Sequence, residues 1–178
     1  MILRELQLAD IPIVADWLAR KETYQWLDFG GGRQVLRAGS LKIMSQRDIH
    51  LLRVYCSESG EAPVGLVALS DVDRTFKTAR LWYLLGNTDF AGRGLTTRAV
   101  SHLLEEGFQT LGLAAVNAWT VEHNTASIRI LERNNFRPIG RQRRCHYIDG
   151  RAFDRLLFDL LAEEHADVGE RRQGSTDL

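Results

Sequence analysis

The stretch "FAGRGLTTRAV" (Phe90–Val100) places two glycines directly before an amphipathic segment. A helix that begins after Gly94 leaves the N–H groups of its first turn without carbonyl partners and carries partial positive charge there. Glycine at such a point allows positive φ and lets an anion approach the main chain closely. Gly92 and Gly94 therefore make either a tight turn or a backbone seat for a phosphate.

The common phosphate-binding loops do not match this stretch. A P-loop continues from its last glycine to lysine, whereas Leu95 follows Gly94 here. A Rossmann fingerprint has three spaced glycines on its first strand–helix turn, whereas this stretch has two and stands late in the chain. These mismatches argue against another nucleotide-binding α/β fold and leave both interpretations of the turn open.

The segments around the glycines alternate between strand and helix patterns. "ARLWYLLG" (Ala79–Gly86) is strongly apolar and predicts a strand. After the glycines, apolar side chains fall on one helical face, and Gly112 can end that helix. Beyond it, strands are predicted at 114–121, 136–147 and 152–161, with a helix "ASIRILERNN" after Asn124 and Thr125 and a hairpin turn at "IDG".

The first part of the chain predicts a mostly antiparallel meander. A strand at 2–8 precedes a helix that has Asp10 as its N-cap and Pro12 in its first turn. "WLDFGGGR" (Trp26–Arg33) is a glycine-rich loop, and the next expected elements are a helix at 35–44 and strands at 49–56 and 63–69. With the β-α-β-α-β order that follows, the sequence predicts a single α+β domain.

Length and charge limit the classes of protein. The 178 residues suffice for one domain with a core, and 23 basic against 23 acidic residues disfavour a large nucleic-acid footprint. No apolar run approaches the roughly 20 residues of a membrane span, and no signal-peptide pattern is present. Cys56 and Cys145 match neither a disulfide framework nor a metal site. We expect a cytoplasmic protein without nucleic-acid or membrane partners, with a domain at 1–163 and a polar, mobile tail at 164–178.

A second motif stands one strand beyond the glycine stretch. Together, "AGRGLTTRAV" and "NTASIRILERNNF" resemble the GCN5-related N-acetyltransferases (GNAT), and within them the RimJ/RimL branch that acetylates N-termini of ribosomal proteins. The family loop, Arg/Gln-x-x-Gly-x-Gly/Ala, aligns with residues 91–96. The later pattern, Asn-x-x-Ser followed by hydrophobic residues and Glu-Lys/Arg-x-Gly-Phe, aligns with Asn124, Ser127, Ile128, Leu131, Glu132, Arg133 and Phe136.

The resemblance extends to about Glu164 and implies a mixed, mostly antiparallel twisted sheet with helices on both faces. It also implies acetyl-CoA as co-substrate and no metal. The pantetheine arm would pair with the backbone of the strand that ends at Leu84 and Leu85, where an N–H can polarise the thioester. The residues that the resemblance assigns to coenzyme binding are Leu84, Leu85, Gly92, Arg93, Gly94, Leu95, Thr96, Thr97, Asn124 and Ser127.

Three positions depart from the family pattern. Ala91 stands where Arg or Gln is usual, and Thr96 stands where a small Gly or Ala is usual. Asn135 replaces Gly after the later helix, and Asn also tolerates the left-handed conformation that a helix end requires. The seat for the pyrophosphate therefore depends on main-chain N–H groups, with Arg93 adding charge.

Acetyl transfer also needs a proton for the departing thiolate. Many relatives use a tyrosine on the later helix, but Leu131 occupies the matching position. The RimL-like branch has serine in the Asn-x-x-Ser pattern, so Ser127 is expected to donate to the sulfur or to orient a water. Ser127 could equally be a serine that only favours a first helical turn, and Asn124 could be only the N-cap.

The group that takes the proton from the amine is open. The RimL-like branch carries a glutamate before its last hairpin, and His146 of "HYIDG" takes that position. Histidine has an ordinary pKa of about 6.5 and can accept a proton near neutrality. Glu122 and His123 are rivals, and water suffices for an α-amine with a pKa of about 7.7–8.0. A purely structural His146 is the remaining alternative.

The first expectation for the acceptor is the N-terminal α-amine of a peptide or protein. A small amine, such as an amino sugar, an antibiotic or a polyamine, is the alternative, and a non-catalytic acyl-CoA-binding module is the rival from another class. A homodimer is also considered. Asp28, Glu122 or Asp149 could bind a cationic amine. The first part of the chain also supplies aromatic residues, most of which are expected in the core: Trp17, Tyr24, Trp26, Phe29 and Trp82.

Overall fold

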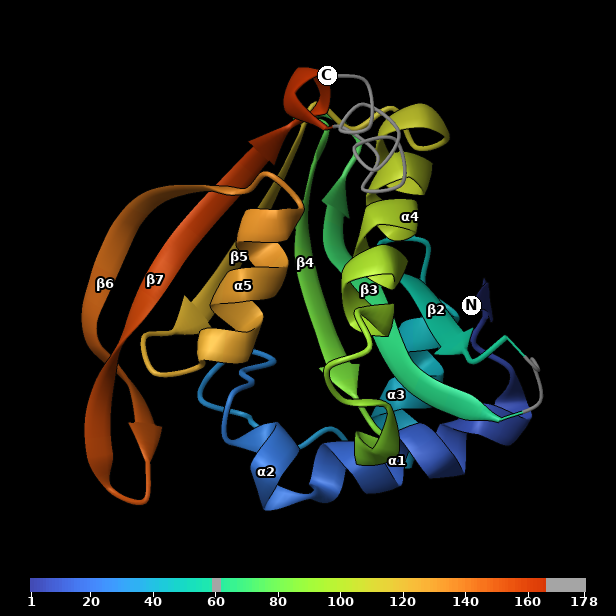
Figure 1. Cartoon of the computed structure of the whole chain (residues 1–178), viewed down its shortest axis with the longest axis horizontal. Helices are drawn as coiled ribbons and strands as arrows, with labels where there is room; N and C mark the ends of the chain where they lie inside the picture. Colours follow the sequence, from blue (N-terminus) through green and yellow to red (C-terminus); the bar gives the residue numbers. More distant parts are fainter. Residues whose placement is uncertain (59–61, 166–178) are drawn as a thin grey trace, which may run out of the picture.

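The computed structural model describes residues 1–58 and 62–165. Within them, seven strands form one twisted sheet in the order β1-β2-β3-β4-β5-β7-β6, in which only β4 and β5 run parallel (Figure 1). The strands are β1 (Ile2–Glu5), β2 (Leu51–Cys56), β3 (Pro63–Asp73), β4 (Thr78–Leu85), β5 (Ala115–Val121), β6 (Arg137–Ile148) and β7 (Arg151–Leu161).

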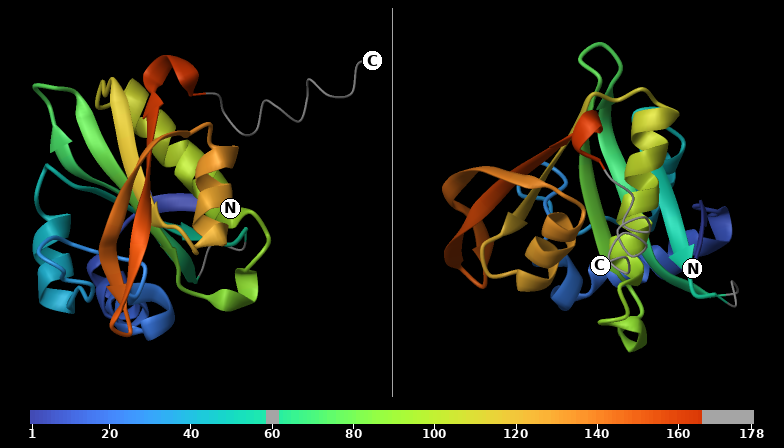
Figure 2. Two further views of the ribbon diagram at one scale, coloured as in Figure 1. Left: turned by 90° about the vertical axis from the view of Figure 1, so that its left-hand side faces the viewer. Right: turned by 45° about the horizontal axis from the view of Figure 1, so that its top comes forward.

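Helices cover both faces of the sheet (Figures 1 and 2). α4 (Leu95–Gln109) and α5 (Thr125–Arg133) lie on one face, over a core that includes Leu69 and Leu103. α1 (Ile11–Ala19), α2 (Lys21–Tyr24) and α3 (Ala38–Ser45) lie on the other face, over a second core that includes Leu18 and Leu66. Short 3-10 turns are η1 (Leu8–Asp10), η2 (Thr88–Phe90) and η3 (Ala162–Glu164). The predicted α+β class, with helices on both faces, is confirmed.

The ends of β1 and β3 differ from the sequence expectation. β1 ends at Glu5 because Asp10 accepts hydrogen bonds from the Gln7 N–H (2.8 Å) and from the Arg4 guanidinium (2.6 and 2.9 Å). Asp10 therefore precedes α1 as expected, but its side chain does not cap that helix. β3 runs past the expected end because Val72 is buried and still donates its N–H to Ile49 O (3.0 Å).

The sheet opens between β4 and β5. The two strands pair only where Thr78–Arg80 meets Ala115–Asn117. Beyond that point β5 stays paired to β7, and the β6–β7 hairpin curls away from the rest of the sheet (Figures 1 and 2). Leu81–Leu85 therefore pairs with β3 along one edge and, within the described sheet, has no β5 partner along the other. This V-shaped opening positions the site.

Glu164, the first residue of the predicted mobile tail, is instead held against the domain. Its carboxylate accepts a hydrogen bond from Leu161 N (3.3 Å) and forms an ion pair with Arg137 (2.8 Å). Its carbonyl accepts from the Asn135 side chain at 3.2 Å. The rest of the expected tail, 166–178, lies outside the described residues, and the boundary at 163 stays a prediction.

Candidate active site

The glycine stretch ends in the N-terminus of α4. Gly92 and Gly94 have φ of 74° and 71°, the left-handed conformation that suits glycine. A Cβ at either position would meet no protein atom within 4 Å, so the space in front of the loop is open. The first helical hydrogen bond runs from Arg98 N to Gly94 O (3.1 Å), which leaves the N–H groups of residues 95–97 outside the helical ladder. The loop can therefore seat an anion as well as turn the chain.

Tyr55 ties this loop to β4. Its hydroxyl lies 2.7 Å from Thr96 Oγ1 and donates to Leu84 O at 3.1 Å. Burial raises the pKa of Tyr55 far above its ordinary value, so the hydroxyl keeps its proton. A Cβ on Gly65 would overlap both the Tyr55 hydroxyl and Leu84 O, so the crossing requires glycine there. Thr96, where the family pattern has a smaller residue, is thus the hydrogen-bond partner of Tyr55.

A pocket of about 780 Å³ runs from the glycine loop past β4 to the opposite face of the sheet. Every residue assigned to coenzyme binding lines it except Arg93, whose guanidinium carbon lies 4.9 Å from the centroid of the Phe90 ring. The structure therefore brings Leu84, Leu85, Gly92, Gly94, Leu95, Thr96, Thr97, Asn124 and Ser127 to one cavity.

Ser127 reaches the pocket from the first turn of α5. Asn124 Oδ1 accepts the Ser127 N–H at 3.2 Å, so Asn124 is the N-cap as well as a pocket residue. Ser127 Oγ lies 2.7 Å from the Tyr83 hydroxyl, which also lies 3.2 Å from Ser127 O. Burial raises the pKa of Tyr83 well above its ordinary value, so Tyr83 remains a donor. When Tyr83 donates to Ser127 Oγ rather than to Ser127 O, the Ser127 proton is available to a group in the pocket.

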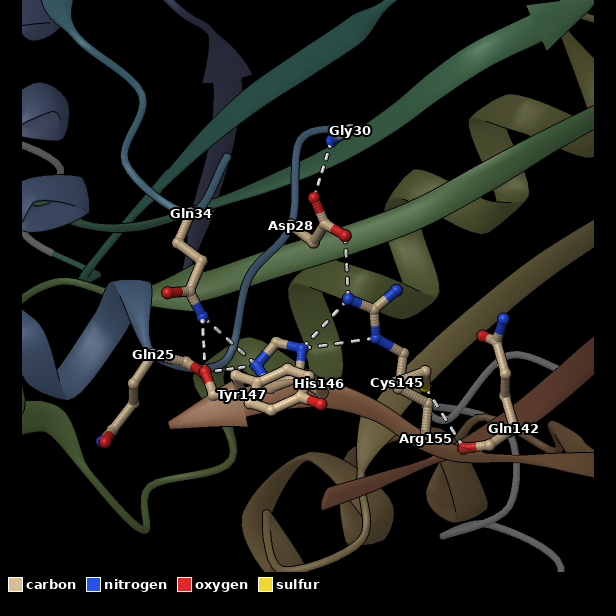
Figure 3. Close-up of polar contacts among 9 residues, drawn as sticks. All are labelled: Gln25, Asp28, Gly30, Gln34, Gln142, Cys145, His146, Tyr147 and Arg155. Carbon is tan, nitrogen blue, oxygen red and sulfur yellow. Dashed lines mark hydrogen bonds and ion pairs between the residues drawn. The ribbon is translucent and has the colours of Figure 1, made fainter. Parts of the chain in front are cut away.

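His146 is buried, with 2% of its surface exposed, and is not among the pocket-lining residues. Its Nε2 lies 2.6 Å from Gln25 O and so carries the ring proton, and its Nδ1 accepts from Arg155 Nη2 at 3.0 Å (Figure 3). Burial lowers the pKa of His146, and the charge of Arg155 acts in the same direction, so the ring is neutral at pH 7. This placement argues against the predicted general-base role and favours the structural alternative.

The His146 contacts belong to a network between the β6–β7 hairpin and the glycine-rich loop (Figure 3). Arg155 Nη2 donates to Asp28 Oδ2 at 2.8 Å, and Asp28 Oδ1 accepts from Gly30 N at 2.8 Å. Burial acts to raise the pKa of Asp28, but the hydrogen bonds from Arg155 and Gly30 outweigh it and hold the pKa below its ordinary value. The Arg155 guanidinium also lies 3.9 Å from the centroid of the Trp119 ring. Together these contacts hold the loop against the sheet.

The other predicted bases and amine ligands are also engaged elsewhere. Glu122 is not a pocket-lining residue: it pairs with Arg141 (3.1 Å) and accepts from Asp154 N (3.0 Å). His123 is exposed and packs edge-on against a phenylalanine, and Asp149 pairs with Lys21 (2.7 Å). The geometry therefore does not favour Glu122 as the base.

Tyr83 and Glu22 are among the pocket residues that the sequence patterns did not single out. Tyr83 could have been found, because strand alternation places it on the opposite face from Leu84. Glu22 lies on the short α2, which no pattern predicted. Of the carboxylates that line the pocket, Asp28 pairs with Arg155 and Asp71 with Arg80 (2.7 Å), whereas Glu22 has no ion pair within the described residues.

Across residues 1–58 and 62–165, no three His, Cys, Asp or Glu side chains gather as metal ligands. No helix in these ranges has the length and apolar character needed to cross a membrane.

A family model described as an acetyltransferase (GNAT) domain matches residues 1–137. The uncharacterized N-acetyltransferase p20 of Bacillus licheniformis is 26% identical over 172 residues, 93% of this chain and 95% of that protein. Spermidine N-acetyltransferase from Vibrio cholerae, solved with CoA and spermine, aligns with a TM-score of 0.80 at 16% identity, covering 92% of this chain and 96% of that one. Mycobacterium smegmatis RimJ, solved with CoA-disulfide, aligns with a TM-score of 0.78 at 22% identity, covering 97% and 88%. At these identities the two structures show a shared fold.

Proposed function

The chain belongs to the GNAT acetyltransferase family, and from this premise we propose that it acetylates the α-amine of a peptide or protein N-terminus. Family membership makes it an N-acetyltransferase that uses acetyl-CoA and transfers acetyl to an amine. The nature of that amine is the proposal. A small-molecule amine, including a polyamine, is the alternative acceptor.

The observation that carries the proposal is the pocket between β4 and β5. Leu81–Leu85 offers an unpaired strand edge along it, to which the pantetheine amides can add like a further strand. The free N–H groups at the start of α4 and the open space before Gly92 and Gly94 fit a pyrophosphate. When bound, acetyl-CoA supplies an activated acyl group. The chain's part is to hold that group beside an amine.

Proton transfer follows from the groups that line the pocket. Ser127, supported by the Tyr83 hydroxyl at 2.7 Å, can deliver a proton to the departing thiolate. An α-amine with an ordinary pKa of about 7.7–8.0 is partly neutral at pH 7 and needs no strong base, whereas a lysine amine at about 10.4 does. Water can therefore take the proton from an α-amine, and Glu22 is the pocket carboxylate that has no ion-pair partner within the described residues and could assist it. The engagement of His146 by Gln25 and Arg155 is thus compatible with an α-amine acceptor.

The proposal is tested in two steps. Acetyl-CoA should raise the melting temperature by binding the native state. CoA release is then measured with peptides that have free or blocked N-termini, with polyamines and with amino sugars. Release with free but not blocked peptides supports the proposal. Preferential acetylation of a small amine would replace the acceptor, and binding without any CoA release would indicate the non-catalytic module.

A cytoplasmic location and a homodimer are further parts of the proposal. Cell fractionation tests the location, and sedimentation of the purified chain tests the dimer.

A further inference from the structure

One end of the pocket is lined by cationic and hydrogen-bonding side chains. Trp82 packs against the core beneath α1–α3, so Arg80, two residues before it on β4, faces the same side of the sheet. Ser70 is the β3 partner of Arg80, and His50 immediately precedes β2, whose first residue Leu51 pairs with Leu69. Arg47, in the turn after α3, lines the same end of the pocket. We refer to Arg47, His50, Ser70 and Arg80 as the basic end of the pocket.

The basic end lies far from the glycine loop. Arg80 stands five residues before Leu85, which corresponds to about 16 Å along the strand at roughly 3.3 Å per residue. The chain turns at the glycine loop only after β4 has ended (Figure 1). A pantetheine arm that runs from the glycine loop along Leu81–Leu85 brings the thioester toward Arg80, so the basic end is placed to contact the acceptor rather than the pyrophosphate.

The basic end carries more cationic side chains than carboxylates that pair with them. Arg80 Nη2 pairs with Asp71 at 2.7 Å, but Arg47 is exposed and has no carboxylate partner within the described residues. His50 Nδ1 is buried and has no hydrogen-bond partner there. Burial lowers the pKa of His50, and Arg47 and Arg80 lower it further against the opposing effect of Asp71, so the ring is neutral and offers one N–H.

We propose that the basic end binds a carboxylate on the acceptor, so that the preferred acceptor is an amine with a nearby carboxylate rather than a polyamine. This inference rests on the proposed acetyl transfer and names the acceptor class for it. Guanidinium groups bind carboxylates through paired N–H donors, and the apolar rings of Phe29 and Trp82, whose centroids lie 5.2 Å apart, reduce solvent screening beside them. A polyamine would instead bring ammonium groups against Arg47 and Arg80.

Two sources share this chemistry: the acidic first residue of a peptide and a free amino acid. The test therefore uses matched pairs that differ only in charge. Peptides that begin with Asp or Glu are compared with peptides that begin with Asn or Gln, and free aspartate is compared with its α-amide. Spermidine serves as the purely cationic amine. Each acceptor is assayed by CoA release with the wild-type chain, with Arg47→Gln and with Arg74→Gln, an exposed arginine outside the pocket lining.

The wild-type chain should favour the acidic member of a pair by about tenfold or more in kcat/KM. Arg47→Gln should bring that ratio close to one without changing the KM for acetyl-CoA, and Arg74→Gln should behave as wild type. If the preference for the acidic member is seen with the peptides, the acceptor is a peptide N-terminus. If it is seen with aspartate over its α-amide, the acceptor is a free amino acid. Equal rates within each pair, a ratio that Arg47→Gln leaves unchanged, or a preference for spermidine would overturn the inference.

A binding measurement separates this inference from the proposed function. In the presence of CoA, the acidic peptides or aspartate should raise the melting temperature of the wild-type chain more than their amides do, and should lose that advantage with Arg47→Gln. No such difference would overturn the inference even if turnover is absent. Failure of acetyl-CoA itself to raise the melting temperature would instead count against the proposed acetyl transfer.

Discussion

Replacing His146 with alanine should destabilise the fold and leave the chemistry nearly intact. The ring donates to Gln25 O (2.6 Å) and accepts from Arg155 (3.0 Å), and each such bond contributes about 1 kcal/mol net. Alanine also leaves the Arg155 donors and the Gln25 carbonyl short of a partner and opens a void beside Trp119, whose ring centroid lies 5.6 Å from that of His146. We expect a total loss of about 3 kcal/mol in the free energy of unfolding.

For a chain of this length, about 3 kcal/mol corresponds to a fall of roughly 6–12 °C in Tm. Calorimetry or thermal denaturation measures this fall, and kcat/KM is measured well below the Tm of the variant. His102→Ala is the matched control, because that side chain is 51% exposed on α4, and its substitution should change the free energy of unfolding by less than about 0.5 kcal/mol.

A general base would give the opposite result. Its loss lowers kcat/KM by about 10²–10⁴-fold and removes one limb of the pH profile. The structural account of His146 is refuted if His146→Ala unfolds within about 0.5 kcal/mol of wild type and loses a hundredfold or more in kcat/KM. A smaller decrease in rate with an unchanged pH profile, accompanied by the fall in Tm, supports it.

Three further predictions concern the coenzyme loop, the serine and the effect of acid. Gly94→Val should weaken acetyl-CoA binding at least tenfold, as measured by calorimetric titration. Gly112→Val is the control, because Gly112 has a similar φ (66°) and an equally open Cβ position, so it should share only the backbone strain of about 1–2 kcal/mol. Equal affinities for acetyl-CoA in the two variants would argue against a pyrophosphate seat at Gly94. Ser127→Ala should lower kcat on the order of a hundredfold with an unchanged Kd for acetyl-CoA, and a change confined to Kd would indicate that Ser127 only binds. The folded-state pKa of His146 is lowered, mainly by burial, so its contribution to stability is present above the ordinary value of about 6.5 and is lost as pH falls through the folded-state pKa. Denaturant unfolding between pH 7 and 5 should show this loss, and His146→Ala should reduce but not abolish it, because burial also lowers the pKa of His50. A pH dependence identical in the variant would contradict that assignment.

Local chemistry made several features of the fold predictable. Asn135 has φ of 66°, as predicted for a left-handed helix end, and the "IDG" turn has positive φ at Asp149 (50°) and Gly150 (77°). Gly92 and Gly94 also have the positive φ that glycine permits. Each of these turns depends on the steric preferences of one or two neighbouring residues, so the residue types alone predict it.

Local rules failed where a distant group competed. Asp10 was predicted to cap α1, but its carboxylate instead accepts two charge-assisted bonds from the Arg4 guanidinium and one from Gln7 N. His146 matched the family position of a base, yet Gln25 and Arg155 occupy both of its nitrogens. Residue 25 is 121 positions away, so no spacing in the sequence pointed to it.

The sequence by itself determined the order of the strands and of the longer helices, the glycine turn before α4, the cap of α5 and, through two motifs, the family. These features depend on periodicity and backbone preference over a few residues. Only the tertiary structure decided that His146 is held within a network, that Tyr83 supports Ser127 and that Arg47, His50 and Arg80 meet at one end of the pocket. Such roles depend on which polar atoms the folded sheet brings within about 3 Å, because hydrogen bonds and desolvation act only at that range.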